Sequence, residues 1–231
     1  LHMARVNVFA LLTHLVKEKD NAYILARHKF LVDTLVEISK LHDSPSHEHA
    51  VKLLAHMTRH RGNSKHLVFK MRKVVPVLVK ASFSQNDETR RHACFALQNL
   101  SQDKPCRQEL AITEDLLTAL CVRIRQASDP VERLSAIHAL KNLTDEPANL
   151  IPMTNTPECF ATLMQIAHAG DDSVTEMMQF LGCDALATLS HWFRSIATSG
   201  QSIDLNKKGR KPNPKDLFVP SLKIVSYQQW Q

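Results

Sequence analysis

The sequence predicts an all-α protein that folds as a solenoid, and three observations support this prediction. Residues 93–101 align with residues 136–144 at a shift of 43 residues, and a fixed period of this size is typical of a solenoid. Hydrophobic residues make up 44% of the chain and charged residues 23%, with only five glycines, which is the balance of a folded helical protein. The breaks between apolar runs recur with the same period.

The strongest repeated unit is a long helix that we expect to be the third of each repeat. A step of 43 residues back from residues 93–101 reaches residues 50–58, and a further step of 42 reaches residues 8–16. Beyond residues 136–144, a step of 46 reaches residues 182–190. The chain therefore holds five copies of this unit.

Two further helices are expected before each of the last four copies. A broad apolar face recurs at Leu31-Val32, Val74-Val75, Leu116-Leu117 and Cys159-Phe160, each followed three residues later by a second apolar pair. A shorter apolar unit precedes each of these, at Ile24-Leu25, Leu67-Val68, Leu110-Ala111 and Leu150-Ile151. Faces of this width must be covered by neighbouring helices. Each repeat thus holds one short and two longer helices.

Turn residues agree with these boundaries. Asp129-Pro130 places a capping carboxylate before a proline at the first helical position, and Glu132 has the spacing of a capping box. The segments 103–105 and 145–147 each carry an aspartate two residues before a proline, and they should break the chain before the short helices.

Three helices in about 43 residues, ending in A-x-x-A-L-x-N-L-S/T, resemble the armadillo repeat of the β-catenin and importin-α type. The resemblance covers roughly residues 7–198 and implies a right-handed α-solenoid; a two-helix HEAT repeat is the nearest alternative. The chain departs from the family in one respect. Armadillo repeats usually carry glycine between the first and second helices, where this chain has Lys73, Glu114 or Asp115, and Pro157.

The resemblance implies a concave groove, lined by the third helices, that holds an extended peptide. In the family an asparagine of the third helix hydrogen-bonds the peptide backbone, and a side-chain amide can donate and accept at once. The matching positions here are His14, His56, Asn99, Asn142 and Thr188. The alternative is that these asparagines bond a neighbouring repeat and stabilise the stack.

Four residues before the asparagine, importin-α places a tryptophan that receives lysine stems. Phe95 and His138 occupy those positions in the two central repeats, so most aromatic slots for cation–π contact are missing. The sequence therefore favours a non-catalytic scaffold or adaptor for an unidentified protein or peptide partner over a nuclear-import receptor.

Charge is unevenly distributed along the chain. The net charge is +8 over residues 1–110, −6 over residues 111–200 and +4 over residues 201–231. A basic patch combines Arg59, Arg61, Lys65, Lys70, Arg72 and Lys73. Binding of nucleic acid or another anionic surface through this half is the alternative function, although no interleaved aromatic residues indicate base stacking.

Other classes of function find no support in the sequence. We expect no enzyme, cofactor or metal, because no glycine-rich phosphate loop, nucleophile–base pair or metal triad is present, and the His56/His60 pair lacks further ligands at metal-binding spacing. No apolar run reaches the roughly 18 residues that span a bilayer. The five cysteines are typical of reduced thiols, which favours the cytoplasm, the nucleus or both. The sequence indicates no oligomeric state.

Three regions are expected along the chain. Residues 1–199 form the solenoid, with about four repeats and a partial one at the N-terminal end that continues upstream. Residues 200–216 form a basic flexible linker whose Lys207, Lys208, Arg210 and Lys211 resemble a short nuclear-localisation signal. Residues 217–231 are an apolar segment, which either docks on its own acidic last repeats or serves as a motif for another protein.

Overall fold

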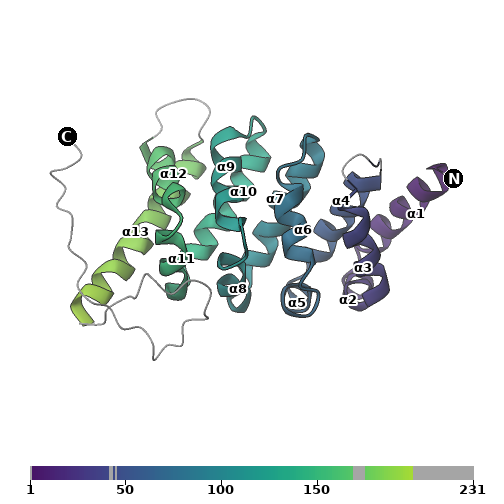
Figure 1. Ribbon diagram of the computed structural model, residues 1–231, viewed down its shortest axis with the longest axis horizontal. Helices are drawn as coiled ribbons and strands as arrows, with labels where there is room; N and C mark the ends of the chain where they lie inside the picture. The colour runs from purple at the N-terminus through teal and green to yellow at the C-terminus, as the bar shows by residue number, and fades with distance from the viewer. Residues whose placement is uncertain (1, 42–43, 45, 169–174, 200–231) are drawn as a thin grey trace.

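The computed structural model describes residues 2–41, 44, 46–168 and 175–199. Among these residues the secondary structure is helical and contains no strand, as predicted. The helices follow one another along one axis from α1 to α13 (Figure 1). The expected linker, the localisation cluster and the apolar segment all fall within residues 200–231, outside the described part.

The helices occur in sets of three. The first helices are α2 (Lys19–Arg27), α5 (Arg61–Lys65) with the π-helical η1 (His66–Lys70), α8 (Arg107–Ala111) after η2 (Lys104–Cys106), and α11 (Leu150–Thr154) after η3 (Pro147–Asn149). The second helices are α3 (Lys29–Ile38), α6 (Val74–Ala81), α9 (Leu116–Gln126) and α12 (Pro157–His168). The third helices are α1 (His2–Leu15), α4 (Ser46–Thr58), α7 (Asp87–Gln102), α10 (Pro130–Thr144) and α13 (Glu176–Ser199).

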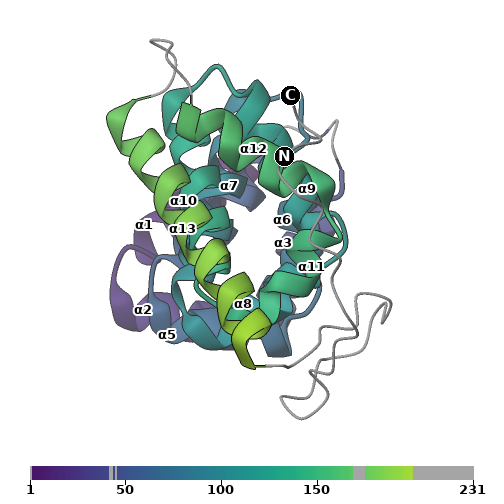
Figure 2. The ribbon, with the colours of Figure 1, turned by 90° about the vertical axis from the view of Figure 1, so that its left-hand side faces the viewer.

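Each kind of helix forms a layer of its own. Seen along the stack, the third helices α1, α10 and α13 lie at the left, the second helices α3, α6 and α9 at the right, and the first helices α2, α5 and α8 below (Figure 2). Consecutive third helices pack on one another, α4 on α7 and α7 on α10. The 43-residue period therefore brings equivalent positions of successive repeats side by side.

A continuous apolar core fills the space between the layers. The third helices α4, α7 and α10 contribute Leu53, Leu97 and Leu140, each 1% exposed or less. The alanines Ala93 and Ala136 are fully buried, which lets neighbouring helices approach closely. Each buried leucine contributes about 1.5–3 kcal/mol relative to an exposed one, so the stack is stabilised mainly by contacts between adjacent repeats.

The third helices begin at side-chain caps. Asp129 accepts a hydrogen bond from the N–H of Val131 at 2.9 Å, as the sequence predicts. One period earlier Asn86 accepts from Thr89 at 2.8 Å. The spacing of Glu132 predicted a capping box, but its carboxyl group lies between the guanidinium groups of Arg90 and Arg123, at 3.4 and 3.5 Å. The side chain of Glu132 thus joins α10 to the two helices that pack on it.

The turn before α9 holds a strained aspartate, at one of the positions where the sequence lacks the expected glycine. Asp115, the residue before α9, has φ 59 and ψ −1, and it is the only described non-glycine residue with positive φ. The left-handed conformation is sterically unfavourable for residues with a Cβ atom, although aspartate tolerates it better than most. The equivalent residue before α6, Lys73, has φ −76 and is therefore free of this steric strain.

We predict that Asp115→Gly raises the free energy of unfolding by about 0.5–1 kcal/mol, because glycine adopts positive φ without a steric penalty. Lys73→Gly is the matched control, and it should lower stability by a similar amount because it adds chain entropy with no strain to relieve. Urea denaturation followed by circular dichroism measures both. Equal destabilisation by the two substitutions would contradict the prediction.

Buried asparagines tie the first helices to the preceding repeat. Asn63 donates from Nδ2 to the carbonyl oxygens of Met57 and Ala22, both at 3.0 Å. Two periods later Asn149 donates to the carbonyl oxygens of Leu143 at 3.0 Å and Arg107 at 3.2 Å. Both side chains are fully buried. These cross-repeat bonds fix the register in which the first helices stack.

Candidate partner-binding face

One stripe of each third helix faces away from the core. On α4, α7 and α10 the half-exposed positions recur with the repeat period, because equivalent residues of neighbouring helices face the same way. We call this surface the third-helix face; it comprises His14, Lys52, His56, Arg59, His92, Phe95, Asn99, His138, Asn142, Asp184 and Thr188. It includes all seven groove residues that the sequence predicts.

The two asparagines of this face are partly engaged with the preceding helix. Asn99 donates from Nδ2 to the hydroxyl oxygen of Thr58 at 3.1 Å, and Asn142 donates in the same way to Ser101 at 3.0 Å. Asn99 is 9% exposed, and Asn142 is half-buried. One amide hydrogen of each therefore serves the stack, which was the alternative role, while each Oδ1 accepts no hydrogen bond from the described residues.

Among the described residues, the outermost predicted groove positions, Thr188 and His14, lack the hydrogen bond to the preceding helix that Asn99 and Asn142 make. Thr188 donates its hydroxyl to the carbonyl oxygen of Asp184 in its own helix at 2.9 Å. The bond to the preceding repeat comes instead from Trp192, whose Nε1–H donates to the carbonyl oxygen of Thr144 at 3.1 Å. His14, at the other end, is exposed. The asparagine pattern is thus confined to α7 and α10.

Aromatic and basic side chains meet between α4 and α7. The guanidinium carbon of Arg59 lies 5.4 Å from the centre of the Phe95 ring, within cation–π range. Arg59 Nη1 lies 3.5 Å from His56 Nδ1, and the rings of His56 and His92 are 6.3 Å apart. Residues from two successive repeats thus form one cluster, and His92 had no place in the sequence prediction.

The histidines of this cluster are held neutral. Burial, followed by the positive charges of Arg59 and the other neighbouring cations, lowers the pKa of His56 to about 4. Burial and the charge of Lys52 also lower the pKa of His92, against the opposing effect of Glu88 and Glu48. In the next repeat, burial and then Lys141 lower the pKa of His138. At neutral pH all three imidazoles can therefore donate and accept hydrogen bonds.

Towards the C-terminal end the charges on these helices are paired. Lys141 contacts the carboxyl groups of Asp145 and Asp184, each at 3.0 Å. Arg91 bonds Asp129 at 2.5 Å and Glu88 at 2.7 Å. These pairs link α7 to the start of α10 and α10 to α13.

The predicted basic patch is divided by the structure. Arg59 belongs to the third-helix face, whereas Arg61, Lys65, Lys70, Arg72 and Lys73 lie exposed on α5, η1 and the turn before α6. Arg72 donates from Nε to the carbonyl oxygen of Phe69 at 3.4 Å. The lysines of this group form no ion pair with the described residues. They present an open basic edge rather than a groove.

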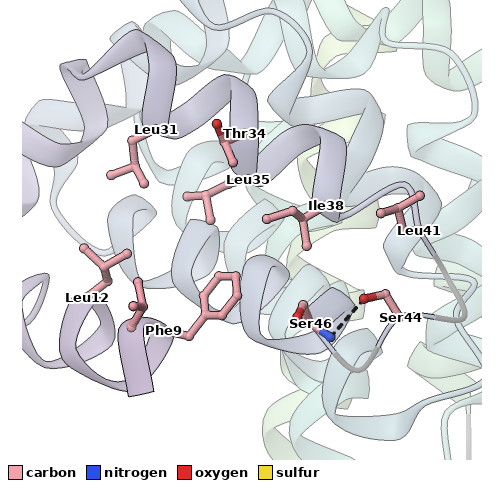
Figure 3. Close-up of a pocket in the computed structure, with 10 residues that line it drawn as sticks. Phe9, Leu12, Leu31, Thr34, Leu35, Ile38, Leu41, Ser44 and Ser46 are labelled. Atoms are coloured by element: carbon pink, nitrogen blue, oxygen red, sulfur yellow. Dashed lines mark hydrogen bonds between the residues drawn. The ribbon is translucent and has the colours of Figure 1, made fainter. Parts of the chain in front are cut away.

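A separate apolar pocket lies at the N-terminal end of the stack. Its volume is about 570 Å³, and it is lined by Val8, Phe9, Leu12, Leu31, Thr34, Leu35, Ile38, Leu41, Ser44 and Ser46. Figure 3 shows the side chains of α1 and α3 pointing toward each other across it.

Two other kinds of site find no support in the described residues. No three His, Cys, Asp or Glu side chains gather there in a way that could hold a metal ion. None of the described helices combines the length and apolarity needed to cross a bilayer.

Comparisons with solved structures identify the fold. Two engineered proteins, Northeast Structural Genomics Consortium targets OR497 and OR329, match at 19% identity, with TM-scores of 0.59 and 0.60. The alignments cover 78% and 83% of this chain, 42% of the first protein and 85% of the second. The designed armadillo repeat protein YIII(Dq.V1)4CPAF in complex with the peptide (KR)4 matches at 16% identity, with a TM-score of 0.52 over 79% of this chain and 92% of that one.

The fold is therefore armadillo-like, as the repeat pattern predicted. Likeness at this level of identity establishes the architecture alone. No protein-family model matches the sequence, and no curated protein matches it.

Proposed function

We propose that this protein is a non-catalytic scaffold that holds an extended segment of a partner protein along the third-helix face. One observation carries the proposal: polar and aromatic side chains recur in register on successive third helices, half-buried at His56, Phe95, His138 and Asn142 and 9% exposed at Asn99. A designed armadillo repeat protein of similar fold binds the peptide (KR)4, which supports the same use of the architecture here.

The geometry suits an extended chain. Packed helices lie 8–10 Å apart, and an extended peptide advances about 3.3 Å per residue, so each repeat spans two to three peptide residues. The amide oxygens of Asn99 and Asn142 have no hydrogen-bond donor among the described residues, so we propose that they accept from peptide N–H groups while the second amide hydrogen of each donates to a carbonyl group. Such contacts read the peptide backbone largely independently of its sequence.

A test must separate peptide binding from stacking, because each asparagine also bonds the preceding helix. We predict that Asn99→Ala/Asn142→Ala weakens partner binding about 10- to 100-fold, from the loss of two or more hydrogen bonds worth about 1 kcal/mol each. Thr58→Val/Ser101→Ala removes the same inter-repeat bonds and keeps both amides, so it should retain binding. Affinity capture with mass spectrometry, run on wild type and both variants, measures the difference.

Partners lost from both variants alike would indicate that the asparagines act only through the stack. Retention of every partner by the asparagine variant would contradict the proposed function.

The basic edge on α5 and η1 supports a second candidate function, binding of nucleic acid or another anionic surface. Its lysines are exposed and without ion-pair partners among the described residues. If this function holds, binding of a single-stranded oligonucleotide falls steeply with salt, and Lys65→Ala/Lys70→Ala weakens it while Asn99→Ala/Asn142→Ala does not. Equal affinity for the wild type and the lysine variant would exclude this edge as the site.

A further inference from the structure

The two halves of the third-helix face differ in how their charges are compensated. In the second half, Lys141 is paired with Asp145 and Asp184. In the first half, Lys52 and Arg59 have no carboxylate within ion-pair distance among the described residues, and neither has Lys17, which follows the end of α1 beside this half. Three cations thus lie unpaired, Lys52 in α4 and Lys17 and Arg59 just after the ends of α1 and α4.

These cations lie near one imidazole. Arg59 Nη1 is 3.5 Å from His56 Nδ1, the ring of His92 is 6.3 Å from that of His56, and the charges of Lys52 and Lys17 also act on His56. We call Lys17, Lys52, His56, Arg59, His92 and Phe95 the α4–α7 cluster. The Arg59 guanidinium carbon lies 5.4 Å from the centre of the Phe95 ring, so a cation–π contact favours this position of the long side chain.

The two carboxylates near the cluster contact side chains other than its three cations. Glu88 binds Arg91 at 2.7 Å and lies 3.8 Å from His92, and Glu48 accepts a hydrogen bond from Asn86 at 3.3 Å. Neither neutralises Lys17, Lys52 or Arg59. An unpaired group of like charges beside half-buried imidazoles is unfavourable in the free protein and becomes favourable once an anion binds.

We propose that the α4–α7 cluster is the subsite for an acidic stretch of the partner, whose Asp or Glu carboxylates pair with Lys17, Lys52 and Arg59 while the segment continues along the third-helix face. This inference rests on the proposed function and adds the charge of the ligand. It gives the chain a preference opposite to that of the designed protein that binds (KR)4, because a basic peptide is repelled by three unpaired cations.

Binding of an acidic ligand is coupled to protonation. His56 is faced by Lys17, Lys52, Arg59 and His92, and His92 by Lys52, Arg91, Glu48 and Glu88. A bound carboxylate favours the charged imidazole and raises both pKa values. Since the complex then binds more protons than the free protein, affinity rises as pH falls from 7.5 to 5.5, where the ligand's carboxyl groups remain ionised.

The test uses the full chain and three labelled octapeptides, (Glu-Ser)4, (Gln-Ser)4 and (KR)4, in fluorescence anisotropy titrations at constant ionic strength. We expect (Glu-Ser)4 to bind at least tenfold more tightly than either other peptide. Lys52→Ala/Arg59→Ala should weaken it at least tenfold, whereas Lys65→Ala/Lys70→Ala, which removes the same charge from the basic edge, should change it less than twofold. His56→Gln/His92→Gln should remove the gain in affinity at pH 5.5.

If Lys52→Ala/Arg59→Ala and Lys65→Ala/Lys70→Ala weakened (Glu-Ser)4 binding equally, the subsite would be overturned, because the peptide would then be attracted by the overall charge alone. Tighter binding of (KR)4 or (Gln-Ser)4, with sensitivity to Asn142→Ala, would overturn the acidic preference and leave the proposed function standing. If captured partners also ignored Asn99→Ala/Asn142→Ala, the proposed function itself would fail. Competition by a thymidine octanucleotide for the cluster would reassign it to nucleic acid.

Discussion

Replacing Asn63 by alanine is expected to lower the free energy of unfolding by about 3 kcal/mol, from lost buried hydrogen bonds and unsatisfied partners. Its Nδ2 group holds the carbonyl oxygens of Met57 and Ala22, and its Oδ1 accepts from Arg27 at 2.8 Å. The side chain is fully buried, so water cannot replace these bonds without opening the contact between two repeats.

Asn149→Ala is the matched comparison. Asn149 makes the same kind of bonds to Leu143 and Arg107, but its buried Oδ1 has no hydrogen-bond partner among the described residues. We therefore expect a smaller loss, about 2 kcal/mol. Urea denaturation gives the change in the free energy of global unfolding, and amide hydrogen exchange in α2 and α5 shows whether the loss of stability is local. A larger effect at Asn149 than at Asn63 would show that the arginine bond contributes nothing.

The sequence predicted the parts of the fold that follow from periodicity. Five copies of the third-helix unit implied equivalent packing, since only a stack of repeats covers apolar faces of that width. The turns at Asp129 and at the two segments before η2 and η3 were predicted from local chemistry alone. The absent glycine before α9 was also visible, and the structure shows its consequence in the positive φ of Asp115.

Long-range polar contacts could not be predicted in the same way. Asn63 and Asn149 lie two periods apart, and this spacing could have indicated that they are equivalent. Cys106 occupies the position one period from each, however, so the asparagine does not recur in every repeat. The double role of Asn99 and Asn142 depends on the hydroxyl groups of Thr58 and Ser101 reaching across one repeat. The α4–α7 cluster could not be predicted because the sequence grouped Arg59 with the other basic residues. Only the packing of α4 on α7 shows that Arg59 lies beside His56 and Phe95 instead.

Glu132 is the position where the sequence indicated one role and the structure another. It is fully buried, and its contacts with Arg90 and Arg123 are 3.4 and 3.5 Å long. Neither carboxyl oxygen accepts a hydrogen bond from the described residues. Burial therefore outweighs the two arginines and raises the pKa of Glu132 above its usual value.

The sign of the pH dependence follows from this shift. Because the folded pKa is the higher one, the folded protein binds the proton more tightly than the unfolded chain does. The contribution of Glu132 to stability is thus greatest below its unfolded pKa and is lost as pH rises through the folded pKa. In Glu132→Gln, which resembles the protonated carboxyl group, this pH-dependent loss should disappear.

At pH 7 we expect Glu132→Gln to change the free energy of unfolding by less than about 1 kcal/mol, since the amide avoids the cost of a buried charge. Glu132→Ala should cost about 3 kcal/mol, because it leaves a cavity and removes the carboxyl group that faces both arginines. Urea denaturation of wild type and both variants between pH 4 and 8 measures the slopes. A glutamine variant as unstable as the alanine variant would show that the ionised carboxylate stabilises the junction of α7, α9 and α10, and that the two arginines outweigh its burial.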